Sequence, residues 1–116
     1  RCAYCGCDLP DRWHVDHIDP VIRDIVYVKG KGRVTGKDML KPELDVLENK
    51  NPACPSCNIM KHSYDIEGFR NMILGFVNSL NEYSTQYKFA KKYGLVSENE
   101  QKVEFYFESL TIKKEE

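Results

Sequence analysis

The sequence lacks any long apolar run, and this excludes a membrane-spanning helix, because about 20 consecutive apolar residues are needed to cross a bilayer. It also lacks a signal-peptide pattern at its start, so we expect a cytoplasmic protein with no membrane contact. Net charge is nearly absent, at −1 over 116 residues, which argues against a surface that is basic throughout, as in many nucleic-acid binders. With 41% hydrophobic and 30% charged residues, the composition is that of a globular domain with a modest core.

Positive charge is nevertheless concentrated in one stretch of the chain. Residues 21–42 carry two acidic side chains and six basic ones: Arg23, Lys29, Lys31, Arg33, Lys37 and Lys41. Because a phosphate backbone responds to local charge, this stretch predicts contacts with nucleic acid. The candidate contact residues are Arg23, Lys29, Lys31 and Arg33. The alternative interpretation is a solvated, lysine-rich loop.

The five cysteines form two pairs and one remainder. Cys2 and Cys5 make one C-x-x-C, and Cys54 and Cys57 make another. Each C-x-x-C forms a turn that offers two thiolates, so two such pairs predict one tetrahedral zinc site. A disulfide framework fits an odd number of cysteines poorly, and a redox C-x-x-C does not need a second pair. Cys7 is left as a small buried residue or an alternative ligand, and the first interpretation is favoured.

Periodicity predicts both strands and helices. Strands are expected at residues 13–18, 24–28 and 103–108, and helices at residues 55–62, 65–80 and 83–93. Residues 29–33 are expected to form a flexible basic turn, Gly36 a further break, and residues 44–53 an irregular segment. Apolar residues spaced by three and four predict one core face on the second helix. They are Phe69, Met72, Ile73, Phe76, Val77 and Leu80, and Trp13 is expected in the core as well.

Several motifs between and around the cysteine pairs together resemble the HNH endonuclease family. They are Cys2-x-x-Cys5, Val15-Asp16-His17-Ile18-Asp19-Pro20, Asn49 and Cys54-Pro-Ser-Cys57-Asn58-x-x-Lys61, which cover about half of the chain. The resemblance implies an α+β fold with a small, zinc-clamped ββα-metal core in residues 1–63. The helices and the terminal strand of residues 64–116 are then expected to pack on this core within the same domain.

The resemblance also implies a role for each matching residue. Asp16 and Asn58 are expected to bind a catalytic divalent ion, and His17 is expected to be the general base. Asn49 matches the family's middle Asn, which orients the imidazole of the base. The family often has His where this chain has Asn58, and an amide oxygen suits Mg²⁺ or Mn²⁺ better than Zn²⁺. Lys61 is similar to a family position that contacts phosphate.

The chemistry of phosphodiester hydrolysis agrees with these residue types. It needs an activated water and a Lewis acid near the phosphate, and a neutral imidazole is a suitable base near pH 7. The expected function is a metal-dependent endonuclease with structural Zn²⁺ and catalytic Mg²⁺ or Mn²⁺, and DNA is the favoured nucleic acid. The alternatives are a non-catalytic zinc module that binds nucleic acid or protein, and a structural zinc domain in an assembly. His14 and His62 stay open as substitute ligands or bases.

Overall fold

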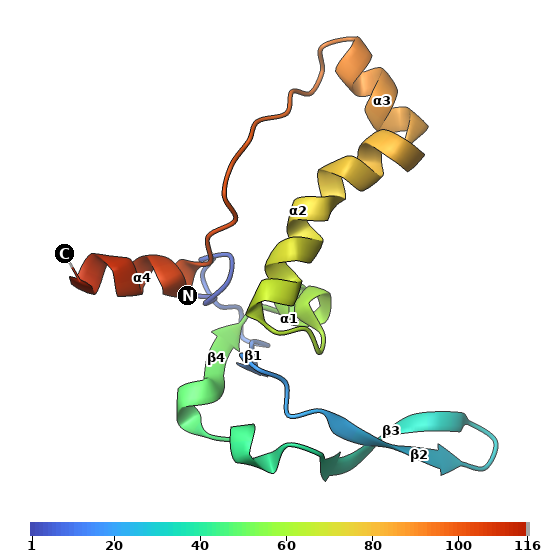
Figure 1. Ribbon diagram of the computed structural model, residues 1–116, viewed down its shortest axis with the longest axis vertical. Coiled ribbons are helices and arrows are strands. Elements are labelled where there is room, and N and C mark those ends of the chain that lie inside the picture. The colour runs from blue at the N-terminus through green and yellow to red at the C-terminus, as the bar shows by residue number, and fades with distance from the viewer. Residues whose placement is uncertain (116) are drawn as a thin grey trace.

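The computed structural model describes residues 1–115, and the side chains of residues 1–23, 26–34, 36 and 38–110 within that range. The strands are β1 (His14–His17), β2 (Arg23–Val28), β3 (Gly32–Met39) and β4 (Lys50–Ala53). The helices are α1 (Pro55–Lys61), α2 (Ile66–Tyr83), α3 (Thr85–Lys92) and α4 (Tyr106–Glu115). The strands pair as two separate antiparallel sheets, so the fold is mixed α and β, as the periodicity predicted (Figure 1).

Strands β1 and β4 pair with each other, and α1 follows β4 directly. The register places His17 opposite Lys50 and His14 opposite Ala53. The expectation of an irregular segment at residues 44–53 is wrong for its second part, because β1 supplies the hydrogen bonds that make residues 50–53 a strand. Sequence alone did not indicate this strand, since Asn51 and Pro52 are both uncommon in strands.

Strands β2 and β3 form a long hairpin that extends away from the rest of the chain (Figure 1). The predicted strand at residues 24–28 is confirmed, and so is a turn at residues 29–31. The expectation that the turn includes Gly32 and Arg33 and that Gly36 is a break is wrong, because these residues belong to β3. Gly30 and Gly32 have φ values of +87° and +76°, which glycine adopts without a Cβ clash. The chain therefore reverses tightly at residues 29–31, and pairing with β2 carries β3 through Gly36.

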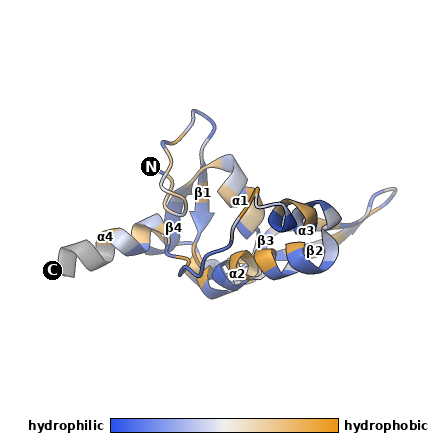
Figure 2. Cartoon of the chain, turned by 90° about the horizontal axis from the view of Figure 1, so that it is seen from above, coloured by the Kyte–Doolittle hydropathy of each residue, from blue (hydrophilic) through white to orange (hydrophobic). Residues whose placement is uncertain are grey.

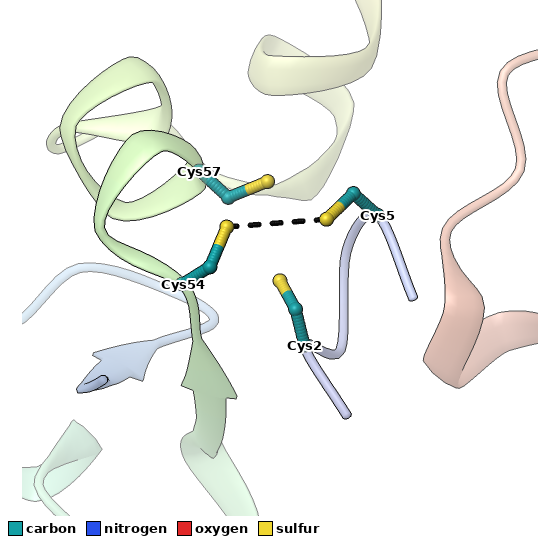
Figure 3. A group of neighbouring side chains, drawn as sticks. All are labelled: Cys2, Cys5, Cys54 and Cys57. Atoms are coloured by element: carbon teal, nitrogen blue, oxygen red, sulfur yellow. Dashed lines mark hydrogen bonds between the residues drawn. The ribbon is translucent and has the colours of Figure 1, made fainter. Parts of the chain in front are cut away.

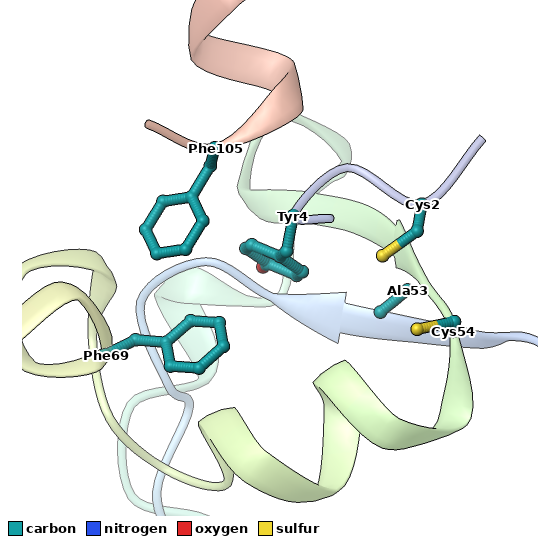
Figure 4. Close-up of a cluster of buried hydrophobic side chains, with 6 residues drawn as sticks. All are labelled: Cys2, Tyr4, Ala53, Cys54, Phe69 and Phe105. Carbon is teal, nitrogen blue, oxygen red and sulfur yellow. The ribbon is translucent and has the colours of Figure 1, made fainter. Parts of the chain in front are cut away.

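The hydrophobic core is small and centres on Tyr4 (Figure 4). The Tyr4 ring meets the rings of Phe69 and Phe105 edge-on at 5.7 and 5.6 Å, and Phe69 stacks on Phe105 at 5.1 Å. Cys2, Ala53 and Cys54 complete the buried cluster. Tyr4 belongs to the N-terminal turn and Phe69 to α2, so this cluster is where the two halves of the chain pack together.

The predicted strand at residues 103–108 is wrong, because a helix begins at Tyr106. The Glu108 carboxylate accepts the Phe105 backbone N–H at 2.9 Å, and the Phe105 carbonyl accepts from Ser109 N–H at 3.2 Å. A Glu three residues after the helix-capping position stabilises a first helical turn in this way. The alternating apolar residues of this segment, Val103, Phe105 and Phe107, are explained by their packing in and against the core cluster and not by a strand.

The apolar stripe on α2 is core only at its beginning. Phe69 is 2% exposed, whereas Phe76, Val77 and Leu80 are about 40% exposed. Trp13 is also largely exposed, contrary to expectation. Figure 2 shows hydrophobic residues continuing along α2 and α3 beyond the core. The radius of gyration is 17.9 Å, against about 13 Å for a compact chain of this length, so the second half of α2 extends away from the core.

Candidate functional site

The four paired cysteines lie together at one end of the β1–β4 pair (Figure 3). The sulfur atoms of Cys2, Cys5, Cys54 and Cys57 are all within 4.8 Å of one another, and none forms a disulfide. The first pair comes from a tight turn closed by the Gly6 N–H bond to the Cys2 carbonyl at 3.0 Å. The second pair begins α1. Four thiols in this arrangement are compatible with a structural metal such as zinc.

The environment of the second pair favours a thiolate at Cys54. The Ser56 hydroxyl, 3.4 Å from Cys54 Sγ, lowers the pKa of that thiol to about 6, against the opposing effect of partial burial. Burial, followed by the neighbouring Cys54 thiol, raises the pKa of Cys57. Metals bind the thiolate form, so at least one ligand is ready near neutral pH. Cys7 is exposed, so its expected burial is wrong. Its sulfur is not one of the four grouped sulfur atoms, but it lies next to them, because the Cys5 thiol raises the pKa of Cys7.

Asp16, His17 and Asn58 line one open hollow beside this cluster. His62, Ile22 and Arg23 complete part of its wall, and its volume is about 780 Å³, within the range of ligand pockets. β1 presents Asp16 and His17, and α1 presents Asn58 one residue after Cys57. The structure therefore brings the three principal candidates together, although they are up to 42 positions apart in the sequence.

The Asp16 carboxylate is buried in a polar cluster under the hollow. Its Oδ2 accepts a hydrogen bond from the Tyr4 hydroxyl and lies 3.0 Å from Lys61 Nζ. Burial, and then this contact with Asp16, raises the pKa of Tyr4. Among the described contacts, Asp16 Oδ1 has no protein partner, so it is the oxygen that can face an ion in the hollow.

Lys61 does not occupy the surface position that a phosphate contact requires. Its side chain is 0% exposed, and its ammonium also donates to the His17 carbonyl at 2.8 Å. The prediction that Lys61 contacts phosphate is therefore corrected: its charge is used inside the protein, to balance Asp16 and to hold β1 against α1. A buried ammonium needs such partners because it has lost its hydration.

His17 is oriented by a residue that the sequence did not single out. Its Nε2 lies 2.9 Å from Asp45 Oδ1, and Lys50 Nζ is 3.2 Å from the same oxygen. His17, followed by Lys50, lowers the pKa of the Asp45 carboxyl. Asp45 lies between two single-turn 3-10 helices, Pro42–Leu44 and Leu47–Asn49. No local pattern indicates such a contact, because it depends on the pairing of β1 with β4.

The Asn49 side chain contacts backbone rather than the imidazole. Its Nδ2 donates to the carbonyls of Asp19 at 2.8 Å and Leu44 at 2.7 Å, and its Oδ1 accepts from the Asp19 N–H at 2.9 Å. It thereby joins the segment after β1 to the segment before Asp45. The Asn49 carbonyl also accepts the Ile18 N–H at 2.8 Å, so Asn49 can position His17 through the residues that follow it as well as through Asp45.

The remaining candidates are divided between the hollow and the hairpin. His62 lines the hollow, and its Nδ1 is bonded to Ser63 Oγ at 2.9 Å. His14 is exposed and is not among the residues that line the hollow. Arg23 lies at the wall of the hollow, whereas the basic residues Lys29, Lys31 and Arg33 lie at the far end of the β2–β3 hairpin. The basic residues therefore extend from the hollow along one arm.

No family model matches the chain, and neither a curated protein nor a solved structure matches it. No helix in the described part of the chain is both long and apolar enough to cross a membrane.

Proposed function

We propose that this chain is a metal-dependent endonuclease of the HNH type, which hydrolyses phosphodiester bonds in nucleic acid. The observation that supports this most is the convergence of Asp16, His17 and Asn58 on one hollow. His17 is in addition held by Asp45, as a catalytic base needs to be. The four-cysteine cluster, as a structural zinc site, would join the N-terminal turn to the helix that carries Asn58.

The donors at the hollow fit a hard divalent ion. Asp16 offers a carboxylate oxygen and Asn58 an amide oxygen, which are ligand types preferred by Mg²⁺ and Mn²⁺. An ion bound by these two residues would supply Lewis-acid stabilisation of the phosphate. Lys61 and Tyr4 hold the opposite oxygen of Asp16, and so orient the carboxylate toward the hollow.

His17 acts as the base in this proposal. With Nε2–H donated to Asp45, the neutral imidazole leaves the Nδ1 lone pair to take a proton. A water molecule passes its proton to Nδ1 while its oxygen forms the new bond to phosphorus. The P–O bond to the leaving oxygen breaks, and that oxygen keeps the bonding electron pair. Asp45 stabilises the imidazolium that results.

One observation favours a second candidate, a zinc module that binds nucleic acid without cleaving it. Lys61 already balances the charge of Asp16 inside the protein, so this carboxylate does not require a metal ion. In that case Asp16, Lys61 and Tyr4 are a buried polar cluster with a structural role only.

Plasmid nicking distinguishes the two candidates. Zinc-loaded protein is incubated with supercoiled DNA, and in parallel with RNA, with and without Mg²⁺ or Mn²⁺. We expect ion-dependent nicking that falls by roughly 10²–10⁴-fold in His17→Ala, the usual effect of removing a positioned base. His14→Ala is the matched control, because His14 is on the same strand but outside the hollow. Equal rates in His17→Ala and the parent, or no cleavage of any substrate, would overturn the nuclease proposal.

A further inference from the structure

The β2–β3 hairpin has few means of stabilising itself. Its strands pair only with each other, and it extends into solvent (Figure 1). Tyr27 is 79% exposed, and Val26 and Val28 are also exposed. A two-stranded hairpin without a covered face is marginally stable in water. A partner that covers it would therefore stabilise both its shape and its exposed apolar side chains.

The charge of the hairpin indicates an anionic partner. Residues 21–42 carry six of the 17 basic residues of the chain but only two of its 18 acidic residues. The rest of the chain is consequently acidic. A basic arm attracts a polyanion, and the acidic remainder of the molecule repels it. A polyanion is therefore directed to the hairpin.

The dimensions of the hairpin select among polyanions. The six residues of β2 extend over about 20 Å at the usual rise of a strand. The major groove of B-form DNA, about 12 Å wide, admits a two-stranded ribbon, whereas the major groove of A-form RNA is too narrow for side chains to read. The tip is compact, because Lys31 N–H bonds the Val28 carbonyl at 3.0 Å. The hairpin therefore fits a DNA groove better than an RNA groove.

The base of the hairpin is continuous with the hollow that contains His17. Ile22 and Arg23 line that hollow, and the Lys41 N–H bond to the Val21 carbonyl at 2.9 Å closes the hairpin base beside it. Ile22 has a φ of +50°, which a β-branched residue rarely adopts. This unusual backbone sets the direction in which the arm leaves the site. A nucleic acid seated in the hollow would meet the hairpin as it continues.

We propose that the β2–β3 hairpin inserts into the major groove of double-stranded DNA beside the hollow, so that duplex DNA is the substrate. The assignment of duplex DNA as the substrate rests on the proposed nuclease function. The insertion of the hairpin into the groove does not depend on cleavage. Tyr27 and Arg33 are cross-strand partners and share one face of the ribbon. That face lies against the groove, and Lys29 and Lys31 at the tip meet phosphates.

The first test measures binding of the zinc-loaded chain without Mg²⁺ or Mn²⁺. Fluorescence anisotropy is recorded with duplex DNA, with one of its single strands and with duplex RNA of the same sequence. We expect tightest binding to duplex DNA. In Lys29→Gln/Lys31→Gln, the slope of log K against log salt should fall by about 2, since each lost phosphate contact removes about 0.9. The matched control, Lys92→Gln/Lys102→Gln, removes two exposed charges outside the hairpin and should keep the slope.

The second test locates the groove. Bound protein should protect guanine N7, which lies in the major groove, from dimethyl sulfate, and Tyr27→Ala/Arg33→Gln should lose this protection. Equal affinity for single and double strands, an equal effect of the hairpin and control variants, or binding of an acidic protein in place of DNA would overturn the inference. Cleavage of single strands that is unaffected by the hairpin variant would overturn it and leave the nuclease proposal intact. Protection of the groove without any cleavage in Mg²⁺ or Mn²⁺ would overturn the nuclease proposal and leave the groove-binding inference intact.

Discussion

Asp16 has two partners inside the protein in addition to its proposed metal ion. It is 6% exposed, and Lys61, which is fully buried, lies 3.0 Å from its Oδ2. The Tyr4 hydroxyl donates to the same oxygen. Because water is nearly excluded from these groups, each depends on the others for its hydrogen bonds. A substitution at Asp16 therefore changes stability as well as any metal binding.

We expect Asp16→Ala to destabilise the protein by about 3–5 kcal/mol, because it leaves the Lys61 ammonium buried without its counter-charge. Asp16→Asn keeps an oxygen acceptor for Tyr4 and Lys61 but also removes the counter-charge, so it should recover only the part of the loss that comes from hydrogen bonding. Urea unfolding of the zinc-loaded variants measures both, and Asp11→Ala, at an exposed aspartate, is the control. If Asp16→Ala unfolds at the parent's midpoint, Lys61 has found another partner and the buried ion pair is not a structural unit.

Asp45 determines which nitrogen of His17 carries the proton. In the parent, Nε2–H faces Asp45 Oδ1 at 2.9 Å, so we expect one tautomer in ¹⁵N NMR spectra of the imidazole. Asp45→Ala should give a mixture of tautomers and lower cleavage by about 10–100-fold, as loss of an orienting partner commonly does. Lys50→Ala is the control, because it removes the other partner of Asp45 but not the imidazole contact. An unchanged tautomer in Asp45→Ala would contradict this role.

Among the elements, α2 and α3 are both bonded to one carboxylate, that of Glu98 in the segment that follows α3. Glu98 Oε2 lies 2.7 Å from the Tyr87 hydroxyl, 2.8 Å from Asn81 Nδ2 and 2.9 Å from Lys91 Nζ. The Tyr87 hydroxyl, followed by Asn81 and Lys91, lowers the pKa of Glu98 to about 2. The segment after α3 is thereby fastened to both helices.

The lowered pKa predicts how this attachment depends on pH. A carboxyl whose folded pKa lies below its unfolded value contributes stability that is complete above the unfolded pKa, near 4.5, and is lost as pH falls toward 2. The ¹³C carboxyl shift of Glu98 should therefore stay flat from neutral pH down to about pH 4. In Tyr87→Phe the titration should move upward, because the first of its three donors is gone. A parent titration midpoint near 4.5 would show that the attachment does not form in solution.

At the scale of the whole molecule, the cysteine cluster joins two parts of the chain that are far apart in the sequence. It fastens the N-terminal turn to α1, next to the Tyr4–Phe69–Phe105 cluster. The core is small and α2 extends beyond it, so burial alone contributes little stability for a chain of this size. Stability should therefore depend strongly on a bound metal.

We expect one zinc ion per chain, and removal by a chelator should unfold the part of the chain around β1, β4 and α1. Cys54→Ser should have the same effect, since the cluster loses one of its four thiols. Cys7→Ser is the comparison and should cost less stability, because Cys7 is exposed and its sulfur is not one of the four that lie within 4.8 Å of one another. Elemental analysis and thermal unfolding report the outcome. Full stability in Cys54→Ser, or equal loss in Cys7→Ser, would exclude the four-cysteine zinc site.

Features of the fold that depend on neighbouring residues in the sequence were predictable. Each C-x-x-C motif places its two thiols close together. Asp65 caps α2 through the Gly68 N–H at 2.7 Å, as a short acidic side chain at that position favours. Gly94, with a φ of +76°, follows the end of α3, which reflects the tolerance of glycine for left-handed backbone.

Tertiary structure decided the features that depend on distant partners. β4 exists because β1 lies beside it, and α4 replaces a predicted strand because Phe105 is seated on Tyr4 while Glu108 caps the first turn. The sequence motif matched Lys61 to a position that contacts phosphate, yet among the side chains that the structure describes its ammonium pairs with Asp16, on a strand 45 positions earlier. Asp45 meets His17 for the same reason. Such contacts depend on which segments the chain brings together, and local propensity contains no information about that pairing.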